Sequence, residues 1–271
     1  MLKATIVIDN ITKNELNAEW GLCVYIEYNG QKYLLDTGSS DKYLNNAKEL
    51  GIDLSDIDYA ALSHAHYDHS GGYDEFFEVN NKAQLYVSSS CDENCYYRFG
   101  FARKYIGVPK GMMSRHEDRI KMASGLQPLG EGAWLVPHIG GNLARIGKRN
   151  HMYVKGPKGY AADRFAHEQS LVFETPKGLV VLNSCSHGGL ENIVKDIECY
   201  MPGKKIYMTI GGLHLSQMRA KNVRKVGKTI RDLNIEHVIT GHCTGDKSFN
   251  ILKEQLGDKA EQMYSGMIIE V

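Results

Sequence analysis

The chain has 271 residues, and its 32 Lys and Arg residues balance its 32 Asp and Glu residues, so the formal net charge is zero. This balance argues against a nucleic-acid binder and against a protein drawn to anionic membranes, because both depend on an excess of positive charge. No apolar run approaches the ~18 residues of a membrane-spanning helix, and the polar N-terminal residues do not resemble a signal peptide. We therefore expect a cytoplasmic protein with neither nucleic acid nor a membrane as its partner.

Strand and helix signals alternate through the first third of the chain. The ranges 23–28 and 31–35 are predicted strands, because the dipeptide Asn29-Gly30 between them is typical of a type I′ hairpin turn. A helix is predicted to follow, with Gly51 just beyond its end, where a left-handed residue is favoured. Two short strands, at 57–62 and 84–87, are predicted after this helix.

Residues 88–165 have weak periodicity and contain clusters of Gly, Pro, Tyr and Arg. We interpret this segment as an irregular, partly helical insertion in a single domain that spans residues 1–271. Two roles stay open for it: packing aromatic side chains on the core, or forming a lid or substrate wall. Its cations are either solvated or hold an anionic group; they are Arg98, Arg103, Lys104, Lys148 and Arg149.

The alternation is better defined from Ser170 onward, where apolar spacing of three and four residues indicates helices between short strands. The predicted strands are 171–174, 179–183, 205–210, 237–240 and 267–271, and the predicted helices are 190–201, 223–233 and 248–256. One α/β domain built from two sheet-plus-helix halves is the simplest account of this order.

The segment from Ser63 to Gly72 places three imidazoles and a carboxylate within six residues, directly after a predicted strand. His64 and His66 point to the same side because they lie two apart in extended chain. A turn after them can present Asp68 and His69 to a second position nearby. Imidazole and carboxylate are ligands that suit zinc or iron, so this pattern predicts a metal site.

Other metal-binding side chains follow predicted strands in the second half of the chain. They are Cys185, His187, His214 and His242. Because the carboxyl ends of strands in open α/β arrangements share one rim, we expect these residues to lie close together. The chain has six cysteines, and in a cytoplasmic protein of this size we expect reduced thiols, one or two of which bind metal.

The segment His64–His69 resembles the HxHxDH signature of the metallo-β-lactamase fold superfamily. The other motifs of that superfamily are matched, in order, by Leu34–Gly38 with Asp36 orienting the metal-binding loop, by His167–Val172, by Cys185 at the usual position of a bridging Asp, and by His242. The resemblance implies an αββα sandwich with the metal site at one edge of two packed mixed sheets.

The same resemblance implies two divalent metal ions, with zinc expected and iron or manganese as alternatives. The expected ligands are His64, His66 and His167 for the first ion, and Asp68, His69, Cys185 and His242 for the second. His187 is the alternative to His167. Otherwise His187 and His214 would bind or protonate the substrate, and Asp68 would also orient the nucleophilic water.

Segments around Trp20, Cys185, His214 and Cys243 resemble the dihydropteroate-synthase-like branch of the superfamily, which is related to ribofuranosylaminobenzene-phosphate synthases. We therefore expect a metal-dependent hydrolase that uses a metal-activated water on a phosphoester or related small anionic substrate, in the manner of a phosphodiesterase. A di-iron redox protein on the same fold is the alternative, and a non-catalytic binding module is a third possibility. The sequence does not indicate an oligomeric state.

Overall fold

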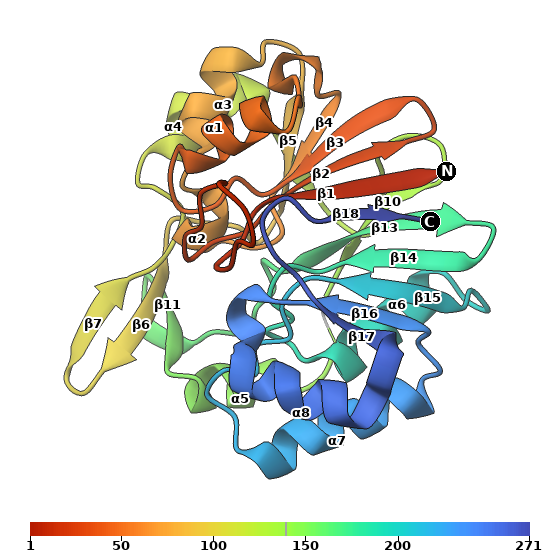
Figure 1. Cartoon of the computed structure of the whole chain (residues 1–271). Coiled ribbons are helices and arrows are strands. Elements are labelled where there is room, and N and C mark those ends of the chain that lie inside the picture. The colour runs from red at the N-terminus through yellow and green to blue at the C-terminus, as the bar shows by residue number, and fades with distance from the viewer. Residues whose placement is uncertain (139) are drawn as a thin grey trace.

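Two seven-stranded sheets pack face to face, and helices cover the outer face of each sheet (Figure 1). The computed structural model describes residues 1–138 and 140–271. The spatial order of the strands is β18-β1-β2-β3-β4-β5-β8 in the first sheet and β17-β16-β15-β14-β13-β10-β9 in the second. Both sheets mix parallel and antiparallel pairs. These layers confirm the predicted αββα sandwich.

The strands of the first sheet are β1 (Leu2–Ile8), β2 (Cys23–Tyr28), β3 (Gln31–Leu35), β4 (Tyr59–Ala61), β5 (Gln84–Ser88), β8 (Ile120–Ala123) and β18 (Ile268–Glu270). Those of the second are β9 (Gln127–Pro128), β10 (Ala133–Pro137), β13 (Gln169–Thr175), β14 (Gly178–Leu182), β15 (Ile206–Ile210), β16 (His237–Thr240) and β17 (Ala260–Gln262). A third sheet consists of β6 (Cys95–Phe99), β7 (Ala102–Tyr105), β11 (Met152–Gly156) and β12 (Gly159–Ala162).

The α-helices are α1 (Lys42–Glu49), α2 (Tyr67–Ser70), α3 (Tyr73–Val79), α4 (Met112–Arg115), α5 (Leu143–Arg149), α6 (Leu190–Tyr200), α7 (Ala220–Asp232) and α8 (Asp246–Leu256). Short 3₁₀ turns span Leu54–Asp56, Glu117–Arg119, His242–Thr244 and Gly257–Lys259. Within the described residues, no helix is both long and apolar enough to cross a membrane.

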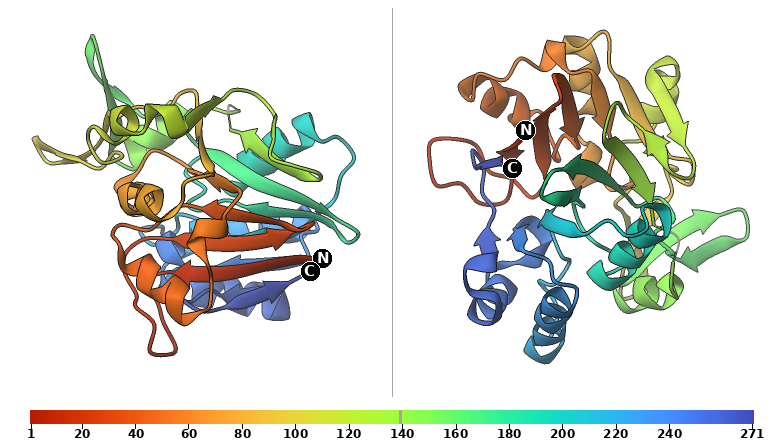
Figure 2. Two further views of the ribbon diagram at one scale, coloured as in Figure 1. Left: turned by 90° about the horizontal axis from the view of Figure 1, so that it is seen from above. Right: turned by 90° about the vertical axis from the view of Figure 1, so that its right-hand side faces the viewer.

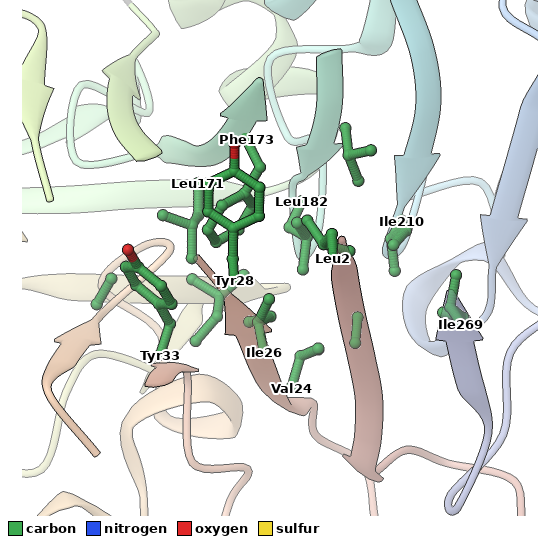
Figure 3. Close-up of a cluster of buried hydrophobic side chains, with 14 of the residues drawn as sticks. Leu2, Val24, Ile26, Tyr28, Tyr33, Leu171, Phe173, Leu182, Ile210 and Ile269 are labelled. Carbon is green, nitrogen blue, oxygen red and sulfur yellow. The ribbon is translucent and has the colours of Figure 1, made fainter. Parts of the chain in front are cut away.

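Side chains from both sheets fill the space between them (Figure 3). Tyr33 from β3 and Phe173 from β13 meet there edge to face, with ring centroids 5.1 Å apart. Alternate residues of each strand point into this core, so its packing fixes how the two sheets lie against each other. The ends of strands from both sheets are thereby brought to a common edge.

The outer faces of the sheets have their own apolar cores. Tyr43 of α1 and Phe76 of α3 are fully buried against the first sheet. Ile193 of α6, Val223 of α7 and Leu252 of α8 are fully buried against the second. In α6 the buried residues Leu190, Ile193, Val194 and Ile197 have the one-sided apolar spacing of a helix that covers a sheet.

Several predicted elements have the predicted bounds, among them β2, β3 and β16. Asn29 and Gly30 have φ angles of 50° and 75°, as a type I′ turn requires, and Gly51 follows the end of α1 with φ 68°. β4 is shorter than predicted. The edge strand β17 was not predicted, because a segment of three residues that are mostly polar is too short to show a periodic pattern.

Residues 88–165 differ from the sequence prediction, because they contain strands where irregular chain was expected. β8 joins the first sheet, β9 and β10 join the second, and the remaining four strands form the third sheet. The β6–β7 hairpin projects from the body of the molecule (Figures 1 and 2). Each strand in this segment has two to five residues, which is too short for a period of two to stand out.

We expect Phe173→Ala to lower the free energy of unfolding by about 3–5 kcal/mol, because it removes a buried ring and leaves a cavity between the sheets. Phe101→Ala is the matched control, since Phe101 at the tip of the β6–β7 hairpin is fully exposed, and its effect should stay within about 0.5 kcal/mol. Urea unfolding followed by circular dichroism measures both. Equal losses would contradict the placement of the core.

Candidate metal centre

Loops that follow four strands meet at one edge of the sandwich. The loop after β4 carries His64 and His66, the short helix α2 that follows it carries Asp68 and His69, and the loop after β14 carries Cys185 and His187. His214 follows β15, and His242 follows β16. The structure therefore brings together the residues that the strand-end argument grouped.

Four non-glycine residues at this edge have left-handed backbone conformations. The φ angles are 62° at Asp36, 51° at Ser186, 51° at His214 and 46° at His242. Such a conformation costs a residue with a Cβ atom about 1–2 kcal/mol. Strain of this kind persists where surrounding structure enforces it, and it is commonly found at functional sites.

One group at the edge consists of Asp68, His69, Cys185 and His242. The Nε2 atoms of His69 and His242 are 3.2 Å apart, and Cys185 Sγ is 3.3 Å from His69 Nε2. Asp68 Oδ2 lies 3.8 Å from His69 Nε2 and 3.6 Å from His242 Nε2. All four residues are at least nine-tenths buried. This is the set that the sequence assigned to the second metal ion.

A second group shares Cys185 with the first. His64 Nε2 and His187 Nε2 are 3.2 Å apart, and both can share one position with the Cys185 thiol. The ring of His66 is 4.6 Å from that of His64 and 4.8 Å from that of His187, measured between centroids. Its Nε2 atom is buried without a hydrogen-bond partner among the described residues.

Hydrogen bonds at Nδ1 orient the rings of His64 and His69. His69 Nδ1 donates to Asp36 Oδ2 at 2.7 Å. Ser63 Oγ also donates to Asp36 Oδ2, at 2.7 Å, and therefore accepts from His64 Nδ1 at 2.8 Å. In each neutral ring the Nε2 lone pair is left to face the centre.

Asn10 does the same for His242. Its Oδ1 atom accepts from His242 Nδ1 at 3.0 Å and from the Gly21 amide at 3.3 Å, while its Nδ2 atom donates to the His242 carbonyl. Sequence reasoning missed Asn10, because a lone Asn after β1 carries no motif. Asp36, in contrast, was predicted to orient the metal-binding loop.

The facing Nε2 atoms of His69 and His242 require a cation or a proton between them, because two imidazole lone pairs 3.2 Å apart repel each other. Burial lowers the pKa of His242 to about 3. Burial also lowers the pKa of His69, but the carboxylates of Asp36 and Asp68 raise it to a net value above the usual one. A divalent metal ion that displaces this proton fits the donor set.

Burial favours the neutral form of His64, His66 and His187. Burial holds the pKa of His64 and of His187 well below the usual value, with neighbouring imidazoles adding to the effect. Burial lowers the pKa of His66 to about 3. Neutral imidazole is the form that binds metal, so these residues are ready to act as ligands.

His167 lies next to His66, and one ligand atom each of His66, Cys95, Asp163 and His167 lie within 4.8 Å of one another. The Nδ1 atom of His167 accepts from the Ala65 amide at 3.2 Å, so its Nε2 atom carries the proton in the neutral ring. That Nε2 atom is 3.1 Å from Asp163 Oδ2 and 3.6 Å from Cys95 Sγ. The expectation that His167 is a ligand of the first ion stays a prediction, although both of its ring nitrogens have partners in the protein.

His187 takes the place beside His64 because its turn is held on two sides. The backbone amide of His187 donates to Glu168 Oε1 at 2.7 Å. The amide of Ser186 donates to Asn183 Oδ1 at 2.6 Å, which supports the left-handed backbone at Ser186. Neither Glu168 nor Asn183 was singled out from the sequence, although both adjoin motif residues.

Two connected cavities open onto the centre. The smaller has a volume of about 170 Å³ and is lined by His66, Asp68, His187 and His242, among other residues. The larger has a volume of about 440 Å³. They share five lining residues, namely Trp20, Tyr97, Met152, His214 and Cys243.

Comparison with known proteins agrees with the αββα fold described above. A family model described as the metallo-beta-lactamase superfamily matches residues 20–150, which include the His64–His69 motif. The solved structure of Tm1679, described as a metal-dependent hydrolase of the β-lactamase superfamily, is 28% identical, with a TM-score of 0.84 over 100% of this chain and 99% of that chain. The chain thus has the fold of the metallo-β-lactamase superfamily, and its residues 20–150 match the model of that family.

Two further relatives refine this placement. A protein of Methanocaldococcus jannaschii named 7,8-dihydropterin-6-methyl-4-(beta-D-ribofuranosyl)-aminobenzene-5'-phosphate synthase is 26% identical, over 91% of this chain and 87% of its own length. It agrees with the branch resemblance seen in the sequence motifs. A diphosphatase from the PhnP family is 12% identical, with a TM-score of 0.56 over 100% of this chain and 98% of that chain, and shares the fold. Metallo-β-lactamase superfamily members of this kind are metal-dependent hydrolases that bind divalent metals.

We expect His187→Ala to lower the metal content, and His167→Ala to leave it unchanged, when each variant is reconstituted with zinc and analysed by elemental mass spectrometry. His167→Ala should instead lower the free energy of unfolding by about 1–3 kcal/mol, because it leaves the buried Ala65 amide without an acceptor. Loss of metal from His167→Ala together with full retention by His187→Ala would reverse the assignment.

Proposed function

We propose that the protein is a hydrolase that uses two divalent metal ions bound at the edge of the sandwich. The observation that carries this proposal is the pair of Nε2 atoms of His69 and His242, which face each other at 3.2 Å while their Nδ1 atoms are held by Asp36 and Asn10. Asp36 and Asn10 bind the Nδ1 atoms, so the Nε2 lone pairs stay free. Proteins commonly orient metal-binding histidines in this way.

The proposed ligands of the first ion are His64, His66, His187 and Cys185, and those of the second are Asp68, His69, His242 and the shared Cys185. Nitrogen and sulfur donors with a single carboxylate favour zinc. Iron and manganese remain alternatives, and manganese is the poorer match because it prefers oxygen ligands. The near absence of carboxylates also gives the di-iron redox alternative little support.

When bound, the metal ions would supply Lewis acidity and lower the pKa of a water molecule toward neutrality. Asp68 is the residue that we propose to orient this water, because its carboxylate reaches both His69 and His242 and also lines the smaller cavity. Trp20 shields the centre from solvent, with its ring centroid 5.1 Å from that of His242.

The larger cavity supports a small anionic substrate. Arg149, at the end of α5, and Arg219, just before α7, line this cavity, and no carboxylate of the described residues does. The arginine ion pairs in the described residues involve Arg115 and Arg224 instead. Two guanidinium groups beside the centre favour phosphate or carboxylate groups, which they bind in bidentate geometry.

Residues 88–165 supply one wall of this proposed substrate site. Tyr97 of β6 and Met152 of β11 line both cavities, and both belong to the third sheet. Of the five cations considered from the sequence, Arg149 lines the larger cavity, and the other four line neither of these two cavities. Arg98 and Arg103 instead lie over the rings of Tyr153 and Tyr160, at 5.7 and 4.2 Å from the ring centroids.

The name of the Methanocaldococcus jannaschii relative favours a second candidate, a synthase reaction on a related substrate. The same cavities and cations suit either reaction, because both require an anionic substrate held next to the metal ions. Product analysis separates the two candidates. The protein reconstituted with zinc is incubated with phosphodiesters, phosphomonoesters, diphosphates, lactones and thioesters, and hydrolysis is expected on a phosphate-containing member of this panel.

We expect Asp68→Asn to bind less than two metal equivalents and to reduce hydrolysis by at least about 100-fold, since even residues that only support metal ligands cost 10–100-fold when removed. Asp74→Asn is the control, because Asp74 pairs with Arg115 away from the centre and loses the same charge. Wild-type metal content and rate in Asp68→Asn would contradict the proposed ligand set.

We expect Arg149→Gln and Arg219→Gln each to raise KM about tenfold for an anionic substrate while leaving metal content unchanged, because each removes one charged hydrogen-bond donor worth about 1.5–3 kcal/mol. Arg145→Gln is the matched control, since Arg145 is exposed on α5 and does not line the cavity. Equal KM values in all three variants would exclude an anion site in the larger cavity.

A further inference from the structure

A third set of metal-binding side chains lies beside the two groups of the proposed dinuclear centre. Cys185, His214 and Cys243 each offer one ligand atom, and these three atoms all lie within 4.8 Å of one another. The three residues follow the neighbouring strands β14, β15 and β16. Neither His214 nor Cys243 belongs to the proposed ligand sets of the two hydrolytic ions.

The chain between β15 and α7 is shaped around the thiol of Cys243. A Cβ atom at Gly212 would lie 2.4 Å from Cys243 Sγ, so only glycine leaves room for the sulfur atom. The His214 amide donates to Cys243 Sγ at 3.3 Å. The amides of Leu215 and Ser216 both donate to the Cys243 carbonyl at 3.1 Å. These contacts hold the sulfur in a fixed place.

His214 contributes an imidazole whose Nδ1 atom is buried without a hydrogen-bond partner among the described residues. Its backbone is held in a left-handed conformation, with φ 51°. Its side chain lines both cavities, next to Cys243. A buried imidazole nitrogen without a partner is costly, and a metal ion held together with the two thiols would satisfy it.

We propose that Cys185, His214 and Cys243 form an additional, thiol-rich position for a soft metal ion of the zinc and cadmium class. Two thiolates and one imidazole are the donors that such ions prefer, and three protein ligands leave a fourth position open toward the cavities. The position shares Cys185 with the dinuclear centre and in that respect rests on the proposed function. It assigns to His214 the role of a ligand, in place of the substrate contact or proton transfer expected from the sequence.

With this position, the candidate ligand groups at the edge of the sandwich differ in how many of their donor atoms are sulfur. Cys185 belongs both to the group with His69 and His242 and to the group with His214 and Cys243, and the second of these groups has more thiols. Soft ions should therefore enter the thiol-rich position before they fill the positions with nitrogen and oxygen donors. The metal content of the protein should consequently depend on which ions are supplied, and in what order.

The test is a titration of the full-length, reduced, metal-free protein with Co²⁺ and, separately, with Cd²⁺. Thiolate-to-metal charge-transfer absorbance reports sulfur ligands directly, without an activity assay. We expect Cys243→Ser to lose about half of this absorbance at saturation and to weaken cadmium binding by at least about 100-fold, which exceeds the effect of removing a supporting residue. Cys91→Ser is the control, because Cys91 is also buried but belongs to none of the metal-binding groups in the described residues.

His214→Gln tests the imidazole separately. It should keep the absorbance of two thiolates while weakening cadmium binding at least about tenfold. If Cys243→Ser does not fold, alkylation of the wild-type protein followed by mass spectrometry replaces it. One equivalent of cadmium should then protect Cys243 and Cys185 from iodoacetamide, and Cys91 should react equally with and without the metal.

Unchanged absorbance and cadmium affinity in Cys243→Ser, or alkylation of Cys243 that cadmium does not slow, would overturn the thiol-rich position. Asp68→Asn distinguishes this result from a failure of the proposed function. If Asp68→Asn retains the two-thiolate absorbance but the wild-type protein hydrolyses none of the substrates, the thiol-rich position stands and the hydrolase proposal fails. If Asp68→Asn loses hydrolysis and Cys243→Ser retains every sulfur signal, the hydrolase proposal stands alone.

Discussion

The buried carboxylate of Asp36 links the two sheets and the candidate metal centre through hydrogen bonds. Asp36 follows β3 of the first sheet, yet it accepts a hydrogen bond at 2.6 Å from Ser184 Oγ, which follows β14 of the second. It also accepts from the amide and hydroxyl of Ser63 and from His69 Nδ1, each at 2.7 Å. Because a fully buried carboxylate depends on such donors for its stability, the docking of the sheets and the orientation of His69 cannot be changed independently.

The parallel strands β14, β15 and β16 explain why the remaining metal-binding residues converge. Parallel neighbours end on the same side of a sheet, so Cys185, His214 and His242 emerge next to one another. Glycine allows the closest approach between these strand ends: a Cβ atom at Gly211 would lie 2.1 Å from the Asn183 carbonyl oxygen. The Gly-Gly pair after β15 therefore lets the ends of these strands pack closely, with Gly212 leaving room for Cys243 Sγ.

The parts of the fold and site that could be predicted are those with local signals. The Asn29-Gly30 hairpin follows from turn chemistry, and the loop from His64 to His69 follows from the spacing of its ligand types. The contacts of His167 with Asp163 and Cys95 could not be predicted, because these two residues reach it through the third sheet. That sheet consists of short strands with long-range pairing, such as β6 with β11, and no local pattern in the sequence specifies such pairing. Asn10 was missed for a similar reason, since it meets His242 only when β1 and β16 lie at the same edge.

Features that lower the stability of the folded chain are concentrated at the edge of the sandwich that carries the candidate metal centre. The core between the sheets is apolar and closely packed, whereas the edge contains buried nitrogen atoms without partners in the described residues, at His66, His187 and His214. Several residues with left-handed backbone lie at the same place. In a metal-free protein each of these features lowers stability, so the apolar core has to offset them. Metal ions that satisfy the free nitrogen atoms would return part of that stability, because ligands that bind only the folded chain stabilise it. If metal ions bind at this edge as proposed, their binding and the folding of the chain would be thermodynamically coupled.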